Sequence, residues 1–397
     1  MSEIEFLTVA NDQGSVQQIE DLLARFQQTS HISLHNNFVS WDAIWRELVN
    51  VGIYRRGADI AELGTTWLES LMAMNVLRPF TANEINRLGG KSAFIPATWM
   101  STSVSGDARV WGIPIRCDVR VIWYWKDMLE DAKIEPVTAF TSPSNIRQTL
   151  EKLTSVLPTP WGTITAVSDP NIIQALATWI WAWESDFVSS DGKKILLMNP
   201  ASLEAMRAYF GLYQFMPLGD PDLSGVKIVN LFMQRKLAAI FAGPWNLQSF
   251  ASYGFQEEDM ARIGISVTPG PPFVGGTVLA IWEHARQVEN IVKFIEYLVQ
   301  PEVQIEYCPL LGLLPTRKEA WETPQMTNDP HYQVIYQALS MGRSLPAVPL
   351  WGMIEEKLKV SFSLIWKDLL LGSQKDVDKA IHAHLEPIVN RLNISIQ

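Results

Sequence analysis

Residues 58–80 place an indole and two hydroxyl groups where a predicted strand gives way to a predicted helix. Gly64 predicts the turn that ends the strand, and Thr66 and Glu69 have the spacing of a capping box. We therefore expect a helix to begin at Thr66, at the edge where open α/β sheets bind ligands. The residues expected at this edge are Gly64, Thr65, Thr66 and Trp67.

A similar arrangement recurs near the start of the chain. Residues 6–10 read as a strand that ends in Asn11 and Asp12, and Ser15 and Gln18 again have capping-box spacing. These side chains offer hydrogen-bonding groups at a second strand end, so we expect both Asn11 and Asp12 to contact a ligand.

A third strand end lies beyond the middle of the chain. Residues 238–242 read as a small apolar strand that ends in Gly243. Pro244 suits the first position of a helix, which would put Trp245 on the first helical turn. Three strand ends of this kind predict a single ligand-binding crevice built from distant parts of the chain.

The elements that must position these residues are those of a globular α/β protein. The chain has 397 residues, 47% hydrophobic and 19% charged, which is enough for two domains. Strands alternate with helices in the first third, and the stretch 111–125 reads as extended because Pro114 excludes a helix interior there. Helices then dominate up to about residue 260, strands return over 262–284, and helices finish the chain. We expect two α/β lobes joined by several crossings.

Charge and composition exclude several classes of protein. The net charge is −10, and no basic run is present, which argues against a nucleic-acid interface. The sequence contains no run of about 18 apolar residues, the length that a membrane-spanning helix needs. The sequence enters its first strand without the charged and apolar regions of a signal peptide. A cytoplasmic protein and a mature exported chain would both look like this.

Cysteine and histidine spacing gives no sign of a metal site. Cys117 and Cys308 fit no metal-ligand pattern; they could form a disulfide in an exported protein, but we expect two free buried thiols. His31 and His35 could share one helical face, yet the residues between them read as a strand. We expect neither a metal nor a cofactor.

Six segments, in order, resemble one protein family. The chain resembles the extracellular solute-binding proteins of bacterial ABC importers, family 1, the group that includes maltose-binding protein. No single segment is specific, but the ordered set spans nearly the whole chain. The segments are ADIAELGTTWLESLMAMNVLRPF, WGIPIRCDVRVIWYWKDM, TWIWAWESDFVSSDGKK with the following NPASLEAM, LAAIFAGPWNL, PGPPFVGGTVLAI and LGLLPTRKEAW.

The resemblance implies a two-lobed α/β fold of the periplasmic-binding-protein type II, with the ligand cleft between the lobes. It implies one lobe of residues 1–114 plus 267–314, a second of residues 115–266 plus 315–397, and hinges near 113–117, 264–269 and 313–318. It also implies an extracytoplasmic protein, periplasmic or lipid-anchored, whose signal peptide is missing here. Ligand would close the hinge, and the partners would be membrane permease subunits. We expect a monomer.

The resemblance and the chemistry of sugars together select the candidate residues. Sugars present apolar C–H faces and many hydroxyls. Indoles that stack on those faces and planar charged groups that hydrogen-bond to the hydroxyls therefore suit a sugar site. The chain has 16 tryptophans, most of which could equally fill cores. We assign Trp99, Trp123, Trp125 and Trp366 to the core, and Trp67 and Trp245 to the ligand.

Further candidates come with structural alternatives. Trp41 and Asp42 follow Ser40 at a helix start, where Asp42 could merely favour the helix dipole. Asp118 and Arg120 match the family's Asp-x-Arg at the lobe boundary, or could pair with each other.

The remaining candidates lie later in the chain. Trp179 and Trp183 match family positions in a run of three alternating tryptophans. Arg343 and Trp351 flank a proline-rich loop like the family's C-terminal ligand loop, although Arg343 could simply be solvated. A glycine turn that could approach a ligand closely, or be an ordinary turn, comprises Gly275, Gly276 and Thr277.

Other functions are weighed against a binding receptor for a carbohydrate or glycoside. An anionic sugar derivative would need Arg120 and Arg343. A glycosidase would need two convergent carboxylates, but no nucleophile elbow, phosphate loop or zinc-protease motif is present. A polyamine receptor would need several carboxylates around aromatic rings. The residues that could supply carboxylates to a glycosidase are Asp12, Asp42, Glu62 and Asp118. We expect a non-enzymatic receptor.

Overall fold

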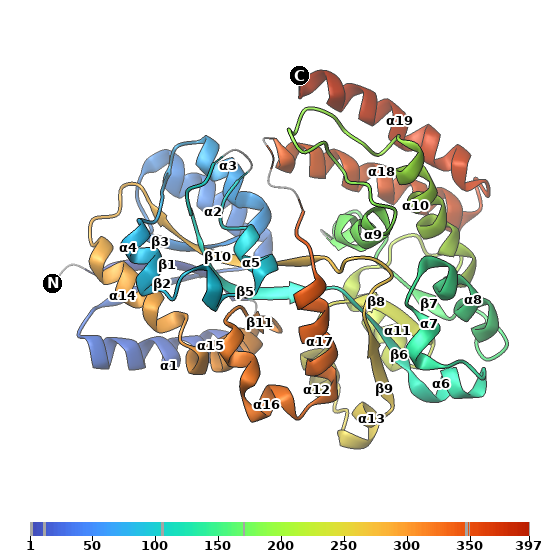
Figure 1. The fold of residues 1–397 in the computed structure, drawn as a ribbon, viewed down its shortest axis with the longest axis horizontal. Helices are drawn as coiled ribbons and strands as arrows, with labels where there is room; N and C mark the ends of the chain where they lie inside the picture. The colour runs from blue at the N-terminus through green and yellow to red at the C-terminus, as the bar shows by residue number, and fades with distance from the viewer. Residues whose placement is uncertain are drawn as a thin grey trace. The chain divides into compact units, whose positions relative to one another are not determined.

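The computed structural model describes residues 3–10, 13–104, 107–169, 171–345, 348 and 350–396 (Figure 1). The chain divides into two compact units. Unit 1 comprises residues 1–118, 274–329 and 347–351, and unit 2 comprises residues 119–273, 330–346 and 352–397. The lobe boundaries implied by the resemblance, after residues 114, 266 and 314, remain a prediction.

Unit 1 is built on a mixed seven-stranded sheet in the order β11-β5-β10-β3-β1-β2, with β4 also paired to β10. β1 runs parallel to both β2 and β3, as the predicted strand–helix alternation requires, whereas β10 runs antiparallel to β3. The strands are β1 (Ile4–Val9), β2 (Leu34–Val39), β3 (Ile60–Gly64), β4 (Leu77–Arg78), β5 (Ile113–Val119), β10 (Val274–Trp282) and β11 (Leu314–Pro315).

Helices cover this sheet because their apolar residues recur on one face. In α1, Ile19, Leu22 and Phe26 are buried against the sheet core. The helices of unit 1 are α1 (Gln13–Ser30), α2 (Trp41–Tyr54), α3 (Leu68–Ala73), α4 (Ala82–Arg87), α5 (Pro96–Met100), α14 (Val288–Leu298), α15 (Pro301–Tyr307) and α16 (Pro324–Thr327). The predicted capping role of Ser15 is wrong: α1 begins at Gln13, and the Ser15 hydroxyl donates to the carbonyl of Leu310 at 3.0 Å.

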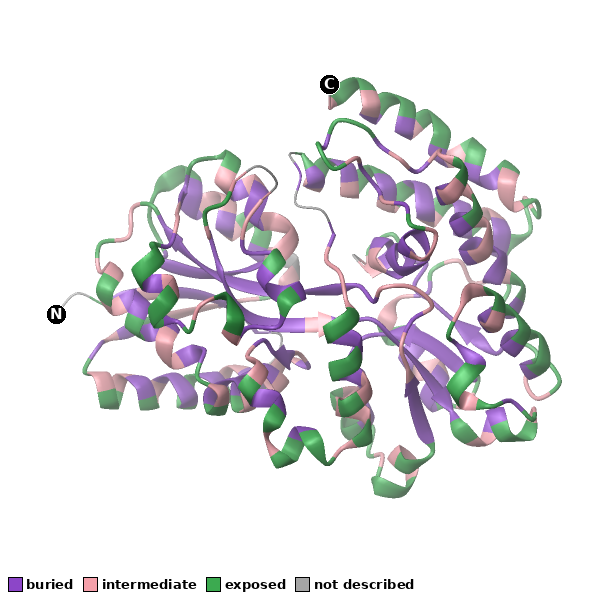
Figure 2. Cartoon of the chain, in the orientation of Figure 1, coloured by how far each residue is buried: buried purple, intermediate pink, exposed green. Residues whose placement is uncertain are grey.

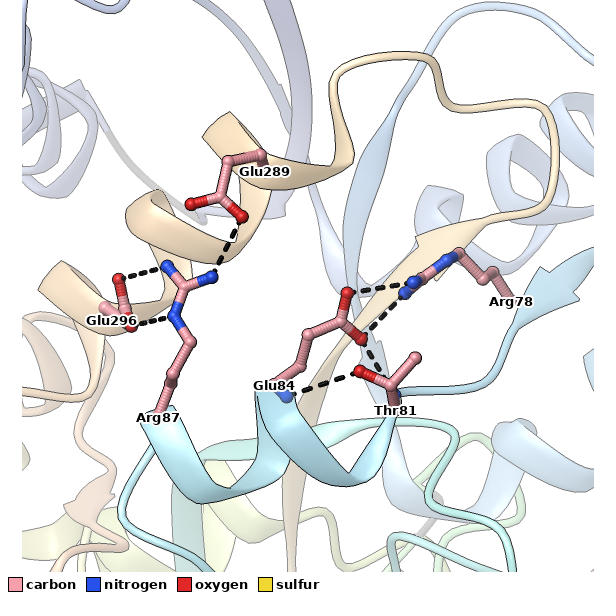
Figure 3. A network of polar contacts seen from close by, with 6 residues as sticks. All are labelled: Arg78, Thr81, Glu84, Arg87, Glu289 and Glu296. Carbon is pink, nitrogen blue, oxygen red and sulfur yellow. Dashed lines mark hydrogen bonds and ion pairs between the residues drawn. The ribbon is translucent and has the colours of Figure 1, made fainter.

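A cluster of ion pairs joins α4 to α14 on the surface of unit 1 (Figure 3). Thr81 and Glu84 form a reciprocal capping box at the start of α4, and Arg78 donates two hydrogen bonds to the Glu84 carboxylate. Arg87, at the end of the same helix, reaches Glu289 and Glu296 on α14. This short helix is therefore held at both ends by charged contacts.

Unit 2 is built on a four-stranded sheet in the order β7-β8-β6-β9. β8 runs parallel to β7, and β6 runs antiparallel to both β8 and β9. Trp123 and Trp125 of β6 are buried, as predicted, and so are Trp99 in unit 1 and Trp366 in unit 2. Both sheets appear largely in the buried colour in Figure 2. The strands are β6 (Val121–Trp125), β7 (Trp161–Gly162), β8 (Ala239–Ala242) and β9 (Ile263–Ser266).

The helices of unit 2 account for most of its chain. Two long helices finish it, and Gly372 follows the first of them as the sequence predicts. The helices are α6 (Lys126–Asp131), α7 (Pro136–Ala139), α8 (Pro143–Leu153), α9 (Asn171–Ala182), α10 (Pro200–Phe210), α11 (Gly225–Met233), α12 (Asn246–Ser252), α13 (Glu257–Ala261), α17 (Pro330–Met341), α18 (Trp351–Leu371) and α19 (Val377–Ser395).

The state of the two cysteines and two absences can be stated for the described residues. Cys117 and Cys308 are free and buried, which confirms the predicted thiols. No helix in the described ranges is long and apolar enough to cross a membrane. Within the same ranges, no group of three or more histidine, cysteine or acidic side chains could hold a metal ion.

Candidate functional site

Three indoles gather in unit 1 where β3 ends and α2 begins. Trp41 is the first residue of α2, after Ser40 in the extended conformation, and its ring centroid lies 6.0 Å from that of Trp67. The ring centroid of Trp45, one helical turn further along α2, lies 5.8 Å from that of Trp67, and the two ring planes are inclined by 49°. Trp41 and Trp67 are half-buried, and Trp45 is 38% exposed. We call these three residues the indole cluster.

The turn that carries Trp67 differs from the one predicted. Residues Thr65–Trp67 form a 3-10 turn (η1), and α3 begins only at Leu68, so the predicted helix start at Thr66 is wrong. No side chain caps either element, and Glu69 is instead buried, which raises the pKa of its carboxyl. The tighter turn leaves both threonines half-buried beside the indole.

Gly64 supports the Trp67 ring directly. A Cβ atom at position 64 would stand 3.3 Å from two atoms of the Trp67 indole, so the ring lies against the bare backbone of the strand end. Gly64 is buried and closes β3. In the structure Gly64 therefore supports the indole, and its expected contact with a ligand stays a prediction.

Trp45 is a member of this cluster that the sequence analysis missed. The signal was available: Trp45 follows Trp41 by four residues in a predicted helix, and such residues share a helical face. The analysis considered Trp41 only as a helix start and did not extend its face by one turn.

Unit 2 repeats the glycine-and-indole pairing at the end of β8. The Trp245 ring folds back over Gly243 so closely that any Cβ there would collide with it. Trp123 donates from its indole nitrogen to the Gly243 carbonyl at 3.2 Å, which fixes this strand end. The predicted helix start at Pro244 is wrong, because α12 begins at Asn246 and Trp245 precedes it.

Arg120 is buried beneath Trp245 instead of facing a ligand. Its guanidinium carbon lies 4.6 Å from the centre of the Trp245 ring and 5.2 Å from that of Phe273. It donates to the side-chain oxygens of Asn171 and Gln174 on α9. The expectation that Arg120 binds ligand directly is corrected: the arginine positions the indole through a cation–π contact.

Asp118 and the expected glycine turn lie in the sheet of unit 1. Asp118 is half-buried and accepts a hydrogen bond from the backbone of Gly275 at 3.0 Å. Gly275, Gly276 and Thr277 are residues of β10, so the predicted turn is wrong. Gly276 has φ of +135°, and a Cβ there would collide with the carbonyl of Arg116. The close approach that glycine allows is therefore to β5, and not to a ligand.

Thr277 hydrogen-bonds to a buried ion pair, which corrects the expectation that it contacts a ligand. Its hydroxyl donates to the Glu62 carboxylate at 2.5 Å, and the Thr8 hydroxyl donates to the same group at 2.6 Å. Arg116 donates to both oxygens of Glu62, once at 2.7 Å, and its guanidinium lies over the ring of Tyr307. Both charged side chains are fully buried. We call these five residues the Glu62 network.

Two predicted ligand tryptophans belong to the core. Trp179 on α9 is fully buried, and its ring packs against those of Tyr209 and Phe241 at 4.9 and 5.4 Å. Trp351 at the start of α18 is also buried. Neither indole offers a surface for stacking, so both expectations are corrected. Trp183, which follows the end of α9, is half-buried and remains a candidate.

Arg343 has an acidic partner within unit 2. Its guanidinium forms an ion pair with Asp186 and lies 5.0 Å from the centre of the Trp181 ring, while Trp181 donates to the same carboxylate at 3.3 Å. The charge of Arg343 is therefore compensated. Its side chain is nevertheless 42% exposed, which agrees with the alternative of a solvated arginine, and its expected role in binding an anionic group stays a prediction.

Three predicted residues cannot be placed in this geometry. Asn11 and Asp12 lie outside the described residues. Asp42 lies in the first turn of α2, but its side chain is outside the described structure. Their contact with a ligand stays a prediction.

Residues 22–334 match the family described as bacterial extracellular solute-binding protein. The chain belongs to this family. It is a family of binding proteins and not of enzymes, and the predicted resemblance is confirmed. A binding protein of Brucella abortus is 23% identical over 337 residues, covering 82% of this chain and 78% of the relative.

Two further similarities come from a relative and from a solved structure. A maltooligosaccharide ABC transporter solute-binding lipoprotein of Streptococcus pneumoniae is 24% identical over 272 residues, covering 63% of this chain and 59% of the relative. The structure of the sugar-binding protein MalE from Xanthomonas citri matches with a TM-score of 0.84 at 20% identity, covering 100% of this chain and 97% of that one. The fold of this solute-binding protein is therefore that of MalE, and the predicted fold class is confirmed.

Proposed function

We propose that this protein is the substrate-binding receptor of an ABC importer and that its ligand is a carbohydrate. The observation that carries the proposal is the indole cluster at a strand end, in a chain of the extracellular solute-binding family. The pneumococcal relative is a maltooligosaccharide-binding lipoprotein of an ABC transporter, and MalE of Xanthomonas citri is a sugar-binding protein. Both support a sugar as the substrate class.

The indole cluster suits a sugar because its rings meet at an angle. The plane of Trp67 is inclined by 49° to that of Trp45 and by 60° to that of Trp41. An indole face stacks on the apolar C–H face of a pyranose, and the hydroxyls of Thr65 and Thr66 lie beside it in the same turn. The cluster thus combines apolar surface with hydrogen-bonding groups.

Unit 2 offers a further indole, Trp245, to the same class of ligand. Trp245 is half-buried, and its ring lies against the Gly243 backbone and 4.6 Å from the Arg120 guanidinium carbon. Such support holds the ring in one orientation before any ligand arrives, which lowers the entropy lost on binding. We assign Trp245 to the ligand and Arg120 to the support of Trp245.

The charges near the candidate residues favour a neutral sugar over an anionic derivative. Arg343 is compensated by Asp186, and Arg120 is buried among amide oxygens and aromatic rings. An anionic ligand would have to share the Arg343 guanidinium with Asp186. A sugar phosphate or sulfonate therefore stays the weaker alternative.

A binding screen and two substitutions test the proposal. Purified protein is screened by thermal shift against mono-, di- and trisaccharides, glycosylglycerols, sugar phosphates and polyamines, and the best ligand is titrated by calorimetry. Ligand at a thousandfold excess over Kd should stabilise the protein by about 4 kcal/mol. Trp67→Ala and Trp45→Ala should each weaken binding by about 2 kcal/mol, roughly thirtyfold in Kd. Tyr54→Ala, on the exposed far end of α2, is the control.

The outcomes separate the candidate functions. A neutral sugar whose affinity falls in both tryptophan variants and not in the control supports the receptor function. Unchanged affinity in Trp67→Ala and Trp45→Ala removes the indole cluster from the site. Binding of anionic glycosides or polyamines alone overturns the neutral carbohydrate.

Transport and closure form the remaining part of the proposal. The family is extracellular, and we propose that this protein works outside the cytoplasmic membrane, where it delivers its ligand to permease subunits. The resemblance to maltose-binding proteins also predicts that ligand closes a hinge. Small-angle scattering should then record a smaller radius of gyration on addition of the ligand, and an unchanged radius at saturation contradicts closure.

A further inference from the structure

Helix α18 carries apolar side chains on two faces, and the described residues bury only one of them. A helix that is apolar all round is normally buried on all sides. One face of α18 lies in the core of unit 2, through Ile354, Leu358, Phe362, Ile365, Trp366 and Leu369. The other face exposes Met353, Val360, Leu364 and Leu371, whose exposed fractions are 38%, 48%, 39% and 50%. We call these four residues the α18 stripe; the helix that carries them is labelled in Figure 1.

The spacing of the α18 stripe is symmetrical. Its residues are separated by seven, four and seven positions, so at 3.6 residues per turn they lie within about 20° of one line along the helix. That line is about 27 Å long. Position 362 is its midpoint, and each residue on one side has a counterpart at the same distance on the other.

The charges beside the stripe follow the same symmetry with opposite signs. Lys357 and Asp368 flank the stripe on one side, and Glu356 and Lys367 flank it on the other. On each side the two charges are opposite and stand almost equally far from position 362. Lys357 and Lys367 are exposed, and Glu356 is exposed although it also pairs with Lys359. Asp368 is half-buried, and its carboxylate already contacts His384 at 2.7 Å and accepts a hydrogen bond from Ser373 at 2.9 Å, so Glu356 and Lys367 form the more available flank.

We propose that the α18 stripe is the contact between two copies of this chain, which pair through antiparallel α18 helices about a two-fold axis. In that arrangement Met353 packs on Leu371 of the second copy, and Val360 packs on Leu364 of the second copy. A two-fold contact must be complementary to itself, and the spacing of the stripe meets that requirement.

The flanking charges fit the same register. The two-fold axis keeps each flank on its own side, so Lys357 stands beside Asp368 of the second copy, and Glu356 stands beside Lys367 of the second copy. Each pair occurs twice in the dimer. A parallel pairing, or a shift by one helical turn, would separate these charges.

A membrane surface fits the stripe less well. Its flanks alternate in sign, and the chain carries a net charge of −10, whereas a surface that binds anionic lipid is rich in lysine and arginine. The dimer proposed here replaces the monomer expected from the sequence, and it does not depend on the identity of the ligand.

The first test measures mass against concentration. Sedimentation equilibrium and light scattering are run on the full chain from low to high micromolar concentration. We expect the mean mass to rise from 44.8 kDa toward twice that value. Val360→Asp/Leu364→Asp should raise the dissociation constant at least about tenfold, because it places charge in an apolar contact. Val226→Asp, an exposed valine on α11, is the matched control.

The second test fixes the register and does not depend on one variant remaining folded. Lys367→Glu should weaken the dimer, and Glu356→Lys/Lys367→Glu should restore it. Oxidation of a mixture of Val360→Cys and Leu364→Cys proteins should yield a cross-linked heterodimer, with little background because Cys117 and Cys308 are buried.

Several results would overturn the dimer. One is a constant mass of 44.8 kDa over the whole concentration range. Another is a dimer that the α18 substitutions leave intact. A third is a monomer that sediments with anionic phosphatidylserine vesicles and loses this property in Val360→Asp/Leu364→Asp, which would make the stripe a lipid-binding surface.

Discussion

Replacing Arg116 by methionine should expose the energetic role of the Glu62 network. The substitution removes the guanidinium that donates to both oxygens of Glu62 and lies 4.5 Å from the centre of the Tyr307 ring. Methionine has a similar volume, so the loss is mainly one of charge and hydrogen bonds. Glu62 would then be a buried carboxylate with hydroxyl donors from Thr8 and Thr277 but no counter-charge.

The expected cost follows from the complete burial of both charges. Breaking a buried ion pair by removing one partner typically costs about 3–5 kcal/mol. A loss of that size should lower the melting temperature of a unit of this size by about 10 °C. Urea unfolding followed by tryptophan fluorescence and by circular dichroism measures it. Arg25→Met, which breaks an exposed ion pair with Glu306, should cost less than about 1 kcal/mol.

A second substitution provides the sharper test. Glu62→Gln/Arg116→Met removes both charges, so it should be more stable than Arg116→Met alone even though it carries one more change. The two substitutions would then not be additive. If Arg116→Met costs less than 1 kcal/mol, or if the double variant is less stable than the single one, the stability of this sheet does not depend on the buried charge pair.

Two further predictions concern unit 1. Burial alone would raise the pKa of Glu84, but hydrogen bonds from Arg78 and the Thr81 backbone outweigh it and lower that pKa. The stabilisation by ionised Glu84 is therefore present above its unfolded-state pKa and is lost as the pH falls through the folded-state pKa. The free energy of unfolding, measured by urea titration, should be about 1 kcal/mol larger for wild type than for Glu84→Gln at neutral pH. The two values should converge in acid, and a difference that stays constant with pH would contradict this prediction. Gly276→Ala should destabilise unit 1 far more than Gly90→Ala, since both glycines have positive φ but only Gly276 faces backbone atoms. Equal melting temperatures for the two variants would refute that reasoning.

The sequence predicted those parts of the fold that local periodicity determines. The burial of α1, the extended stretch that became β5 and β6, and the long C-terminal helices follow from apolar spacing and from proline and glycine. The helix starts after β3 and β8 were each placed two positions too early, because the residues up to Trp67 and Trp245 form turns in which the indole packs on the preceding glycine. The spacing of a capping box cannot reveal the packing of an indole on the backbone of the preceding strand end.

In the candidate site, too, the sequence predicted residues whose positions depend on local structure and failed for those that depend on distant partners. Trp67 and Trp245 were predicted from strand ends, and their half-buried indoles lie at those ends. Trp179, Trp351 and Thr277 were not distinguishable from ligand residues, because their burial depends on partners distant in the sequence. Likewise, no spacing shows that Asp186 compensates Arg343 from 157 positions away.

The seating of Trp67 on Gly64 and of Trp245 on Gly243 bears on how such a receptor can change its ligand. Each ring is supported by main-chain atoms, which remain the same whichever side chains vary nearby. Replacement of neighbours such as Trp45 or Thr65 can alter size and hydrogen-bonding preference while the two platforms keep their orientation. Specificity in this protein can therefore diverge through residues around the rings, with the rings themselves as fixed points.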